Sequence, residues 1–178
     1  MPDSIGQLEQ LKKLELRKNR ITQLPVSITA LKHLEILVLN FNLLTTIPNQ
    51  IGQLASLQRL ELANNKIPQI PESFGGLKKL RMLTLRDNKL QKLPDSIGNL
   101  SRLNQFNLSS NFLIMLPLTV IKLEKLQSLN IANNELTQIN PELVQLKKLT
   151  KLTLSSNNFA TAEKQKIRWL FPHLRLKF

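Results

Sequence analysis

Asparagine recurs every 23 residues along the chain, and this interval constrains the fold more than any other feature of the sequence. The recurring residues are Asn19, Asn42, Asn65, Asn88, Asn111, Asn134 and Asn157. Each one closes the frame LxxLxLxxN, in which L stands for Leu, Ile or Phe and x for any residue. Self-similarity at a period of roughly 20 to 50 residues is typical of proteins in which each unit buries its apolar side against the next. The seven units therefore predict a stack of equivalent coils.

Each unit divides into a strand and a return. The LxL segment alternates with a period of two, which predicts a short strand with one buried face and one solvent-facing face. A Pro stands six positions after the Asn in five units, from Pro25 to Pro117, and the sixth unit has Pro141 one position later. Pro cannot donate to a sheet ladder, so we expect it to begin the return. The apolar spacing of three after Pro predicts a 3₁₀ turn or another tight turn.

The Asn side chains are expected to lie inside the bend that follows each strand. A buried amide there can exchange hydrogen bonds with backbone groups of its own coil and of the adjacent coil, which would otherwise lack partners. The seven asparagines are therefore predicted to form a structural ladder along the stack.

These motifs resemble the leucine-rich repeat family, in its class with 23-residue repeats and an LPxxIxxL return, which is found in bacterial and Ras-group proteins. The resemblance covers roughly residues 2–159. It implies an α/β fold: a right-handed leucine-rich repeat solenoid, or horseshoe, with a parallel β-sheet on the concave side and irregular or 3₁₀ returns on the convex side. It also implies that the concave face binds another macromolecule.

The chain is interpreted as one leucine-rich repeat domain that consists of a partial repeat at residues 2–10, seven strand units at 11–159 and a cap at 160–178. A solenoid that begins within a coil exposes apolar side chains that another coil would cover. At this N-terminal edge the side chains are Ile5, Leu8, Leu11 and Leu14. We expect either self-association through this edge or an upstream domain that packs on it.

The cap departs from the repeat pattern. Thr161 is the expected N-cap of a helix that carries apolar residues at helical spacing and ends before Pro172. Apolar residues then alternate over 174–178, which predicts a final, eighth strand. Residues 146–178 hold eight Lys and Arg but only one acidic residue, so the polar side of the cap is strongly basic.

The third, fifth and seventh places of the LxxLxLxxN frame point away from the core, so equivalent places in stacked coils form columns on one surface. Apolar side chains at such places are typical of a protein interface, which has an apolar centre within a polar rim. The predicted protein-binding residues on the concave face are Ile36, Val38, Arg59, Glu61, Met82, Thr84 and Arg86. Phe41 and Phe112, beside the ladder Asn of their coils, are the candidate rim residues.

Each candidate also has a purely structural interpretation. β-Branched residues favour strands wherever they stand, and the two Phe side chains can tuck between coils. Arginines on the sheet can pair with acidic residues of the same sheet; the residues concerned are Arg17, Arg59 and Arg86 with Glu15, Glu61 and Asp87. Burial and pairing distinguish the two interpretations.

Composition and spacing argue against catalysis. The sequence has no Cys, which excludes disulfides, Cys-ligated metals and thiol chemistry. Its two histidines, His33 and His173, stand far apart and its five Gly form no phosphate-binding loop, so we expect no metal, no cofactor and no enzyme. No stretch reaches the roughly 18 apolar residues of a membrane-spanning helix, so membrane insertion is not expected. The first residues lack the pattern of a signal peptide, and the sequence assigns no compartment.

The sequence therefore favours a non-catalytic protein–protein interaction module that binds a macromolecular partner on its concave face. The alternative is electrostatic binding to nucleic acid, an acidic membrane or an acidic polysaccharide through the basic C-terminal region, because the formal net charge is +13. The lack of base-stacking aromatic residues on the predicted sheet counts against nucleic acid.

Overall fold

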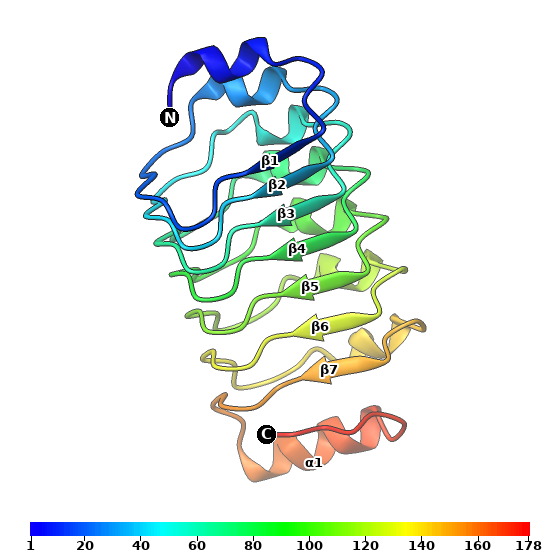
Figure 1. Ribbon diagram of the computed structural model, residues 1–178. Coiled ribbons are helices and arrows are strands. Elements are labelled where there is room, and N and C mark those ends of the chain that lie inside the picture. The colour runs from blue at the N-terminus through cyan, green and yellow to red at the C-terminus, as the bar shows by residue number, and fades with distance from the viewer.

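The LxL segments form seven strands of three residues each, which stack in chain order as one parallel sheet (Figure 1). The computed structural model describes all 178 residues. Paired residues stand one repeat apart, as Lys13 with Ile36 and Ile36 with Arg59. The strands are β1 (Lys13–Glu15), β2 (Ile36–Val38), β3 (Arg59–Glu61), β4 (Met82–Thr84), β5 (Gln105–Asn107), β6 (Ser128–Asn130) and β7 (Lys151–Thr153). The predicted parallel-sheet solenoid is confirmed.

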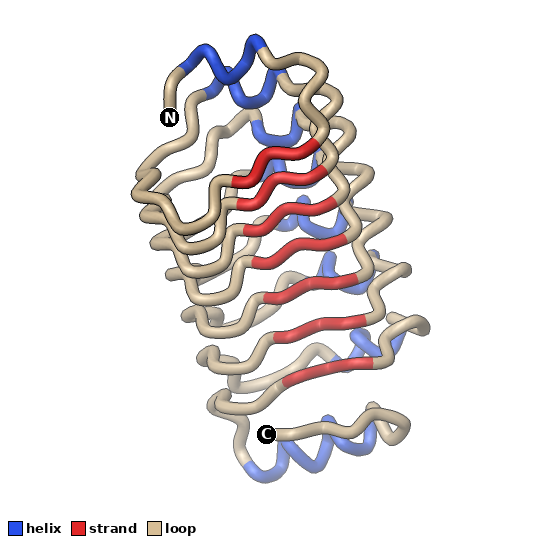
Figure 2. Tube along the Cα trace, viewed as in Figure 1, coloured by secondary structure: helices blue, strands red, loops and turns tan.

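Seven 3₁₀ helices form the opposite side of the coils, and Figure 2 shows them stacked behind the sheet. Five begin directly after a Pro in extended conformation, such as Pro25 or Pro94, whose fixed φ turns the chain out of the sheet side. The helices are η1 (Asp3–Gln7), η2 (Val26–Ala30), η3 (Ile51–Gln53), η4 (Glu72–Gly76), η5 (Asp95–Asn99), η6 (Leu118–Lys122) and η7 (Pro141–Gln145). These returns agree with the prediction from the apolar spacing.

Glycine at one place of the return lets consecutive 3₁₀ helices pack closely. A Cβ atom added to Gly52 would stand 2.0 Å from the backbone oxygen of Ser73 in the next coil, so no side chain fits there unless the coils separate. An added Cβ also meets the next coil at Gly6, Gly75 and Gly98. The helices come least close where Thr29 or Ile121 stands in place of this glycine. Single residues therefore set the spacing of the coils on the convex side.

Leu and Ile side chains from successive coils form one continuous core between the sheet and the 3₁₀ helices. Phe74 and Phe106 are fully buried in places that other coils fill with Ile, Leu or Val. Burying one such side chain contributes about 1.5–3 kcal/mol, and most of its apolar contacts come from its own coil and the two neighbouring coils. Each coil is therefore held in place by the coils on either side of it.

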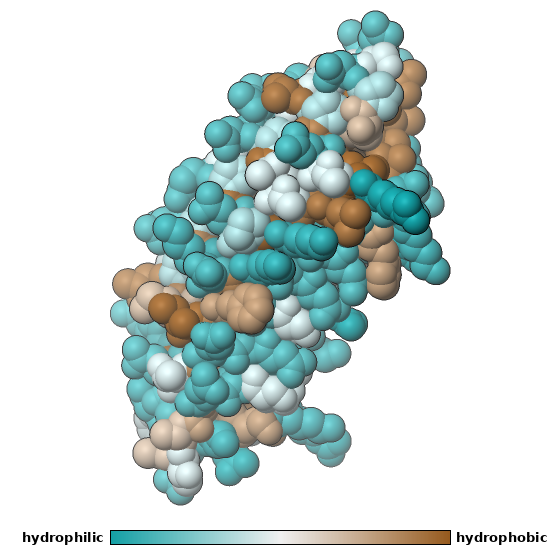
Figure 3. Space-filling model, turned by 90° about the vertical axis from the view of Figure 1, so that its left-hand side faces the viewer, coloured by the Kyte–Doolittle hydropathy of each residue, from teal (hydrophilic) through white to brown (hydrophobic).

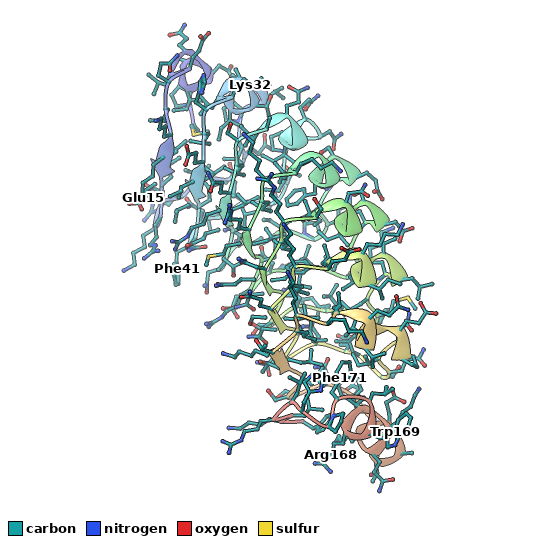
Figure 4. The ribbon with its side chains drawn as sticks, turned by 90° about the vertical axis from the view of Figure 1, so that its right-hand side faces the viewer. Glu15, Lys32, Phe41, Arg168, Trp169 and Phe171 are labelled. Atoms are coloured by element: carbon teal, nitrogen blue, oxygen red, sulfur yellow. The ribbon has the colours of Figure 1, made fainter.

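One α-helix, α1 (Thr161–Leu170), covers the last coil, so the predicted capping helix is formed. Ile167 and Phe171 are buried against the core, whereas Trp169 is 80% exposed on the outer side (Figure 4). None of the helices is both long and apolar enough to span a membrane.

The predicted N-cap of α1 was wrong. Ala160 occupies that position, Thr161 is the first helical residue, and no side chain caps the helix. The carboxylate of Glu163 in the first turn instead accepts the Ile139 N–H of the preceding coil at 3.0 Å. A contact between coils thus anchors the start of α1, where a local capping bond was expected.

The predicted eighth strand is not formed, and the sheet ends at β7. Residues 174–178 do alternate between partly buried and exposed, but no backbone hydrogen bond joins them to β7. The ring of Phe178 packs edge-on against Phe159, with 6.1 Å between ring centroids, and the Arg168 guanidinium lies 5.2 Å from its centroid. Side-chain packing on α1 and the last coil therefore holds this tail without strand pairing.

The N-terminal edge of the stack is open. No residue before Leu24 is buried, although equivalent leucines of the inner coils are fully buried. Leu8 is 52% exposed, and Ile5, Leu11 and Leu14 are only partly buried. The apolar edge is present, and self-association or an upstream domain on it stays a prediction.

Candidate functional site on the concave face

The ladder asparagines bond each coil to the one before it. Asn88 Oδ1 accepts the Ile67 N–H at 3.1 Å. Its Nδ2 donates to the carbonyl oxygens of Leu62 at 2.9 Å and Leu85 at 3.0 Å. Ile67 and Leu62 belong to the preceding coil, so one side chain joins two coils. Bonds of the same kind to the preceding coil are made by Asn42, Asn65, Asn111, Asn134 and Asn157. Asn19 differs, because it is exposed and donates only to carbonyls of its own coil.

The residue before each ladder Asn adopts the left-handed conformation, with φ between 52° and 59°. The positions are Lys18, Phe41, Asn64, Asp87, Ser110, Asn133 and Ser156. Asn and Asp tolerate this conformation, whereas a bulky residue such as Phe41 adopts it only under constraint. The ladder bonds beside it supply that constraint. Phe41 therefore projects from the sheet side of the molecule (Figure 4) and is 49% exposed.

The apolar part of the concave face consists of two side chains that flank a charged one. Ile36, Arg59 and Met82 are in register on β2, β3 and β4. Ile36 and Met82 are partly buried, and Arg59 between them is exposed. Neighbouring strands stand about 4.8 Å apart, which places the two apolar side chains about 10 Å apart. A partner could contact both at once.

Val38 is not available to a partner. It is only 3% exposed and lies in register between Glu15 and Glu61. The strand preference of β-branched residues accounts for its presence. The predicted apolar centre therefore reduces to Ile36 and Met82.

Glu61 is also buried, at 5% exposure, but polar groups surround its carboxylate. One oxygen binds the Arg59 guanidinium, and the other accepts from Asn40 Nδ2 and lies 3.7 Å from Arg17. Asn40 Oδ1 accepts the Ala63 N–H at 2.7 Å. Side chains of the first three coils thus meet in one network, in which two arginines share one carboxylate. A binding partner would therefore meet arginines that are already paired with Glu61. The group of Arg17, Arg59 and Glu61 carries a net charge of +1.

Pairing within the sheet accounts for other charged candidates as well. Arg86 Nε donates to Asp87 Oδ2 at 2.7 Å, and Thr84 is partly buried without a side-chain hydrogen bond. Lys13 lies 2.8 Å from Glu15. The hydrogen bond from Lys13, followed by its positive charge, lowers the pKa of Glu15 below its ordinary value of 4.5. The charged candidates of the first four coils are thus paired with acidic residues of the same face.

Coils five to seven present mostly small polar groups, one cation, Lys151, and no acidic residue at the third, fifth and seventh places of the frame. Asn107 Oδ1 accepts the N–H of Ser109 at 3.0 Å, and Asn130 Oδ1 accepts that of Ala132 at 3.1 Å. These bonds turn the amide oxygens toward the strands. The NH₂ groups of both side chains are therefore free to donate to a ligand.

Phe41 and Phe112, at 49% and 48% exposure, are not tucked between coils. Coil five adds exposed Ile114, Met115 and Leu118 at places that most other coils fill with polar residues. Figure 3 shows hydrophobic atoms gathered at separate places on this flank among hydrophilic ones. These residues lie outside the strand positions from which the binding residues were predicted. Their signal in the sequence is that apolar residues stand in coil five where the equivalent positions of most other coils are polar.

The acidic and histidine side chains do not gather into a metal-binding cluster. No group of three or more His, Asp or Glu is placed to hold a metal ion. His33 near the beginning of the stack and His173 in the tail are both exposed and far apart along it. The surface offers donors, ion pairs and a few apolar contacts, which suit binding.

Comparison with known sequences agrees with this geometry. A family model described as a leucine-rich repeat region matches residues 57–170, more than half of the chain, and one described as a leucine rich repeat matches residues 9–67. The chain belongs to the leucine-rich repeat family. Members of this family typically act as binding scaffolds, which supports a protein-interaction module in this general sense.

Leucine-rich repeat proteins of known structure share the fold. One from Leptospira interrogans is 31% identical over 99% of this chain and 57% of its own, with a TM-score of 0.53. An internalin of Listeria monocytogenes is 22% identical over 98% of this chain and 49% of its own, with a TM-score of 0.81. The plant peptide hormone receptor RGFR1, in complex with RGF2, is 26% identical over 100% of this chain and 33% of its own, with a TM-score of 0.75. This chain thus spans less than two thirds of each of these proteins. No curated protein matches it significantly.

Proposed function

We propose that this leucine-rich repeat chain is a non-catalytic module that binds a protein partner on its concave face, centred on Ile36 and Met82. The observation that carries the proposal is the placement of these two accessible apolar side chains on an otherwise polar sheet. The similarity to the plant peptide hormone receptor RGFR1, solved in complex with RGF2, supports a protein or peptide as the ligand class.

The shape and rigidity of the sheet also favour a protein partner. Six steps of about 4.8 Å between seven strands make a surface about 29 Å across, wide enough for a folded protein or an extended segment. The ladder bonds and the Glu61 network hold this surface in one conformation before binding. Preorganisation of this kind reduces the conformational entropy lost on association.

The double variant Ile36→Asp/Met82→Asp tests the proposal. Both side chains lie on the solvent side of the sheet, so we expect a melting temperature close to that of the unsubstituted chain. Two carboxylates at the centre of an interface should weaken binding by at least about tenfold, because the apolar contacts are lost and the charged groups must be desolvated on association. The measurement is the dissociation constant of the partner captured on the immobilised chain and identified by mass spectrometry.

Ile114→Asp/Leu118→Asp is the matched control, because it makes the same chemical change on the flank of coil five. We expect this variant to bind as well as the unsubstituted chain. The proposal is wrong if the flank variant loses affinity and the concave variant does not. It is also wrong if the ligand is a polyanion whose affinity falls steeply with salt and is unchanged by Ile36→Asp/Met82→Asp, which would favour the electrostatic alternative.

A further inference from the structure

The C-terminal tail leaves a cleft beside the last strand. The cleft has a volume of about 470 Å³ and opens between β7 and residues 174–177, where no backbone hydrogen bond closes the tail onto the sheet. Phe178 anchors the tail through its contacts with Phe159 and Arg168. The alternate side chains of the tail, Arg175 and Lys177, are exposed and line the opening. Because the tail does not pair with β7 as an eighth strand, a cleft remains open at the end of the concave face.

Three cations line this cleft and no carboxylate does. They are Lys151 on β7 and Arg175 and Lys177 on the tail. All three are exposed, and none takes part in an ion pair of the chain. The sheet arginines of the first four coils, in contrast, already have acidic partners. Unpaired cations that converge on one concavity attract anions and supply charge-assisted hydrogen bonds.

The neutral polar side chains of the cleft also offer donors. The Ala132 N–H occupies the amide oxygen of Asn130, so the Asn130 NH₂ group is free to donate to a ligand in the cleft. The Thr153 hydroxyl lines the cleft without a protein partner and can donate as well. Five side chains of the cleft can therefore donate at once. A ligand rich in acceptor oxygens satisfies them, whereas an apolar ligand leaves them unsatisfied.

We infer that this cleft binds a carboxylate-bearing peptide segment of the protein partner. The inference rests on the proposed function, because Asn130 and Thr153 stand at the fifth frame place of β6 and β7 and make the cleft continuous with the concave face. No aromatic side chain lines the cleft, so it provides no platform for nucleic-acid bases. A segment with two or three Asp or Glu residues matches three unpaired cations.

The test uses the full chain and a short fluorescein-labelled peptide in which Asp alternates with Ser. The same peptide with Asn in place of Asp and an oligothymidine of equal charge serve as comparison probes. Fluorescence anisotropy at physiological ionic strength measures their affinities. We expect the Asp peptide to bind more tightly than both probes, because the donors of the cleft match carboxylates and its surface does not stack bases.

The triple variant Lys151→Gln/Arg175→Gln/Lys177→Gln should lower the affinity for the Asp peptide by at least about tenfold, because charge-assisted hydrogen bonds are lost. Its matched control is a triple variant that removes the same charge from exposed, unpaired lysines outside the cleft. The control substitutions are Lys79→Gln, Lys89→Gln and Lys122→Gln. We expect the control to change the affinity by less than about twofold, since exposed distant charges are screened.

Equal losses in the two triple variants, or equal binding of the oligothymidine, would overturn the inference, because bulk charge would then explain the attraction. Ile36→Asp/Met82→Asp should leave binding of the short Asp peptide within about twofold, since those residues lie on β2 and β4, distant from β7. The Asp peptide therefore tests the cleft alone, whereas binding of the partner protein to Ile36→Asp/Met82→Asp tests the proposed concave centre.

Discussion

Asn88→Ala compared with Asn19→Ala tests whether the ladder holds the coils together. Both changes remove the same side chain from the same place of the repeat. Asn88 is 6% exposed and bonds to two coils, whereas Asn19 is exposed and bonds only to its own. The carbonyl of Leu16 that Asn19 contacts also accepts from Asn42, so Asn19→Ala leaves no buried group without a partner. We expect Asn19→Ala to cost less than about 1 kcal/mol of unfolding free energy.

The cost of Asn88→Ala follows from its bonds. The Ile67 N–H lies in a residue with no exposed surface and loses its partner, which costs about 1–3 kcal/mol. The carbonyls of Leu62 and Leu85 keep bonds from neighbouring ladder asparagines, so the two bonds lost there cost about 1 kcal/mol each. The sum is about 3–5 kcal/mol, a large fraction of the roughly 5–15 kcal/mol by which most domains are stable.

Urea denaturation followed by circular dichroism measures both variants, and the slopes of the transitions show whether the free energies are comparable. For a chain of this length each kcal/mol lowers the melting temperature by about 2–4 °C, so Asn88→Ala should lower it by about 6–20 °C. Equal losses of stability in the two variants would refute the reasoning. They would show that the bonds between coils contribute no more than those within one coil.

Three further changes test other parts of the account. Gly52→Ala places a Cβ 2.0 Å from the Ser73 carbonyl oxygen and should cost about 1–3 kcal/mol by thermal denaturation, and a neutral result would mean that the coils separate freely. Glu61→Gln removes the charge that two arginines share and should cost about 1–2 kcal/mol, so a gain in stability would contradict the network. The folded-state pKa of Glu15 is lowered, so its pairing with Lys13 stabilises the fold above about pH 4.5 and is lost as the pH falls through that lower pKa. An NMR titration of Lys13→Met should find the Glu15 pKa restored toward 4.5, and an unchanged pKa would argue against this cause.

The stack of coils follows from the sequence because the local signals of each unit agree with one another. The alternation in LxL specifies a strand, Pro begins the return, and the Asn at every twenty-third position supplies the bonds of the bend. Each signal acts within one coil or between neighbouring coils. Repetition therefore makes the strands, the returns and the order of the sheet predictable.

Features that depend on several coils could not be predicted from the place of a residue in the frame. Val38 and Glu61 stand at outward-facing places, but the side chains around them bury both. Residues 174–178 have the alternation of a strand, but pairing also requires the tail to approach β7, and the packing of Phe178 on Phe159 holds it elsewhere. The local pattern predicted which side chains point outward. It could not predict which of them are covered, because the covering side chains belong to other coils.

Site-specific photocrosslinking tests the binding surface most directly. A benzophenone amino acid replaces Met82 on the concave face, Leu118 on the flank or Asn49 in the return between β2 and η3, one position at a time. The account predicts that the partner crosslinks to the chain substituted at position 82 and not to the other two. Crosslinks at position 118 or 49, with none at position 82, would show that the concave face is not where the partner binds.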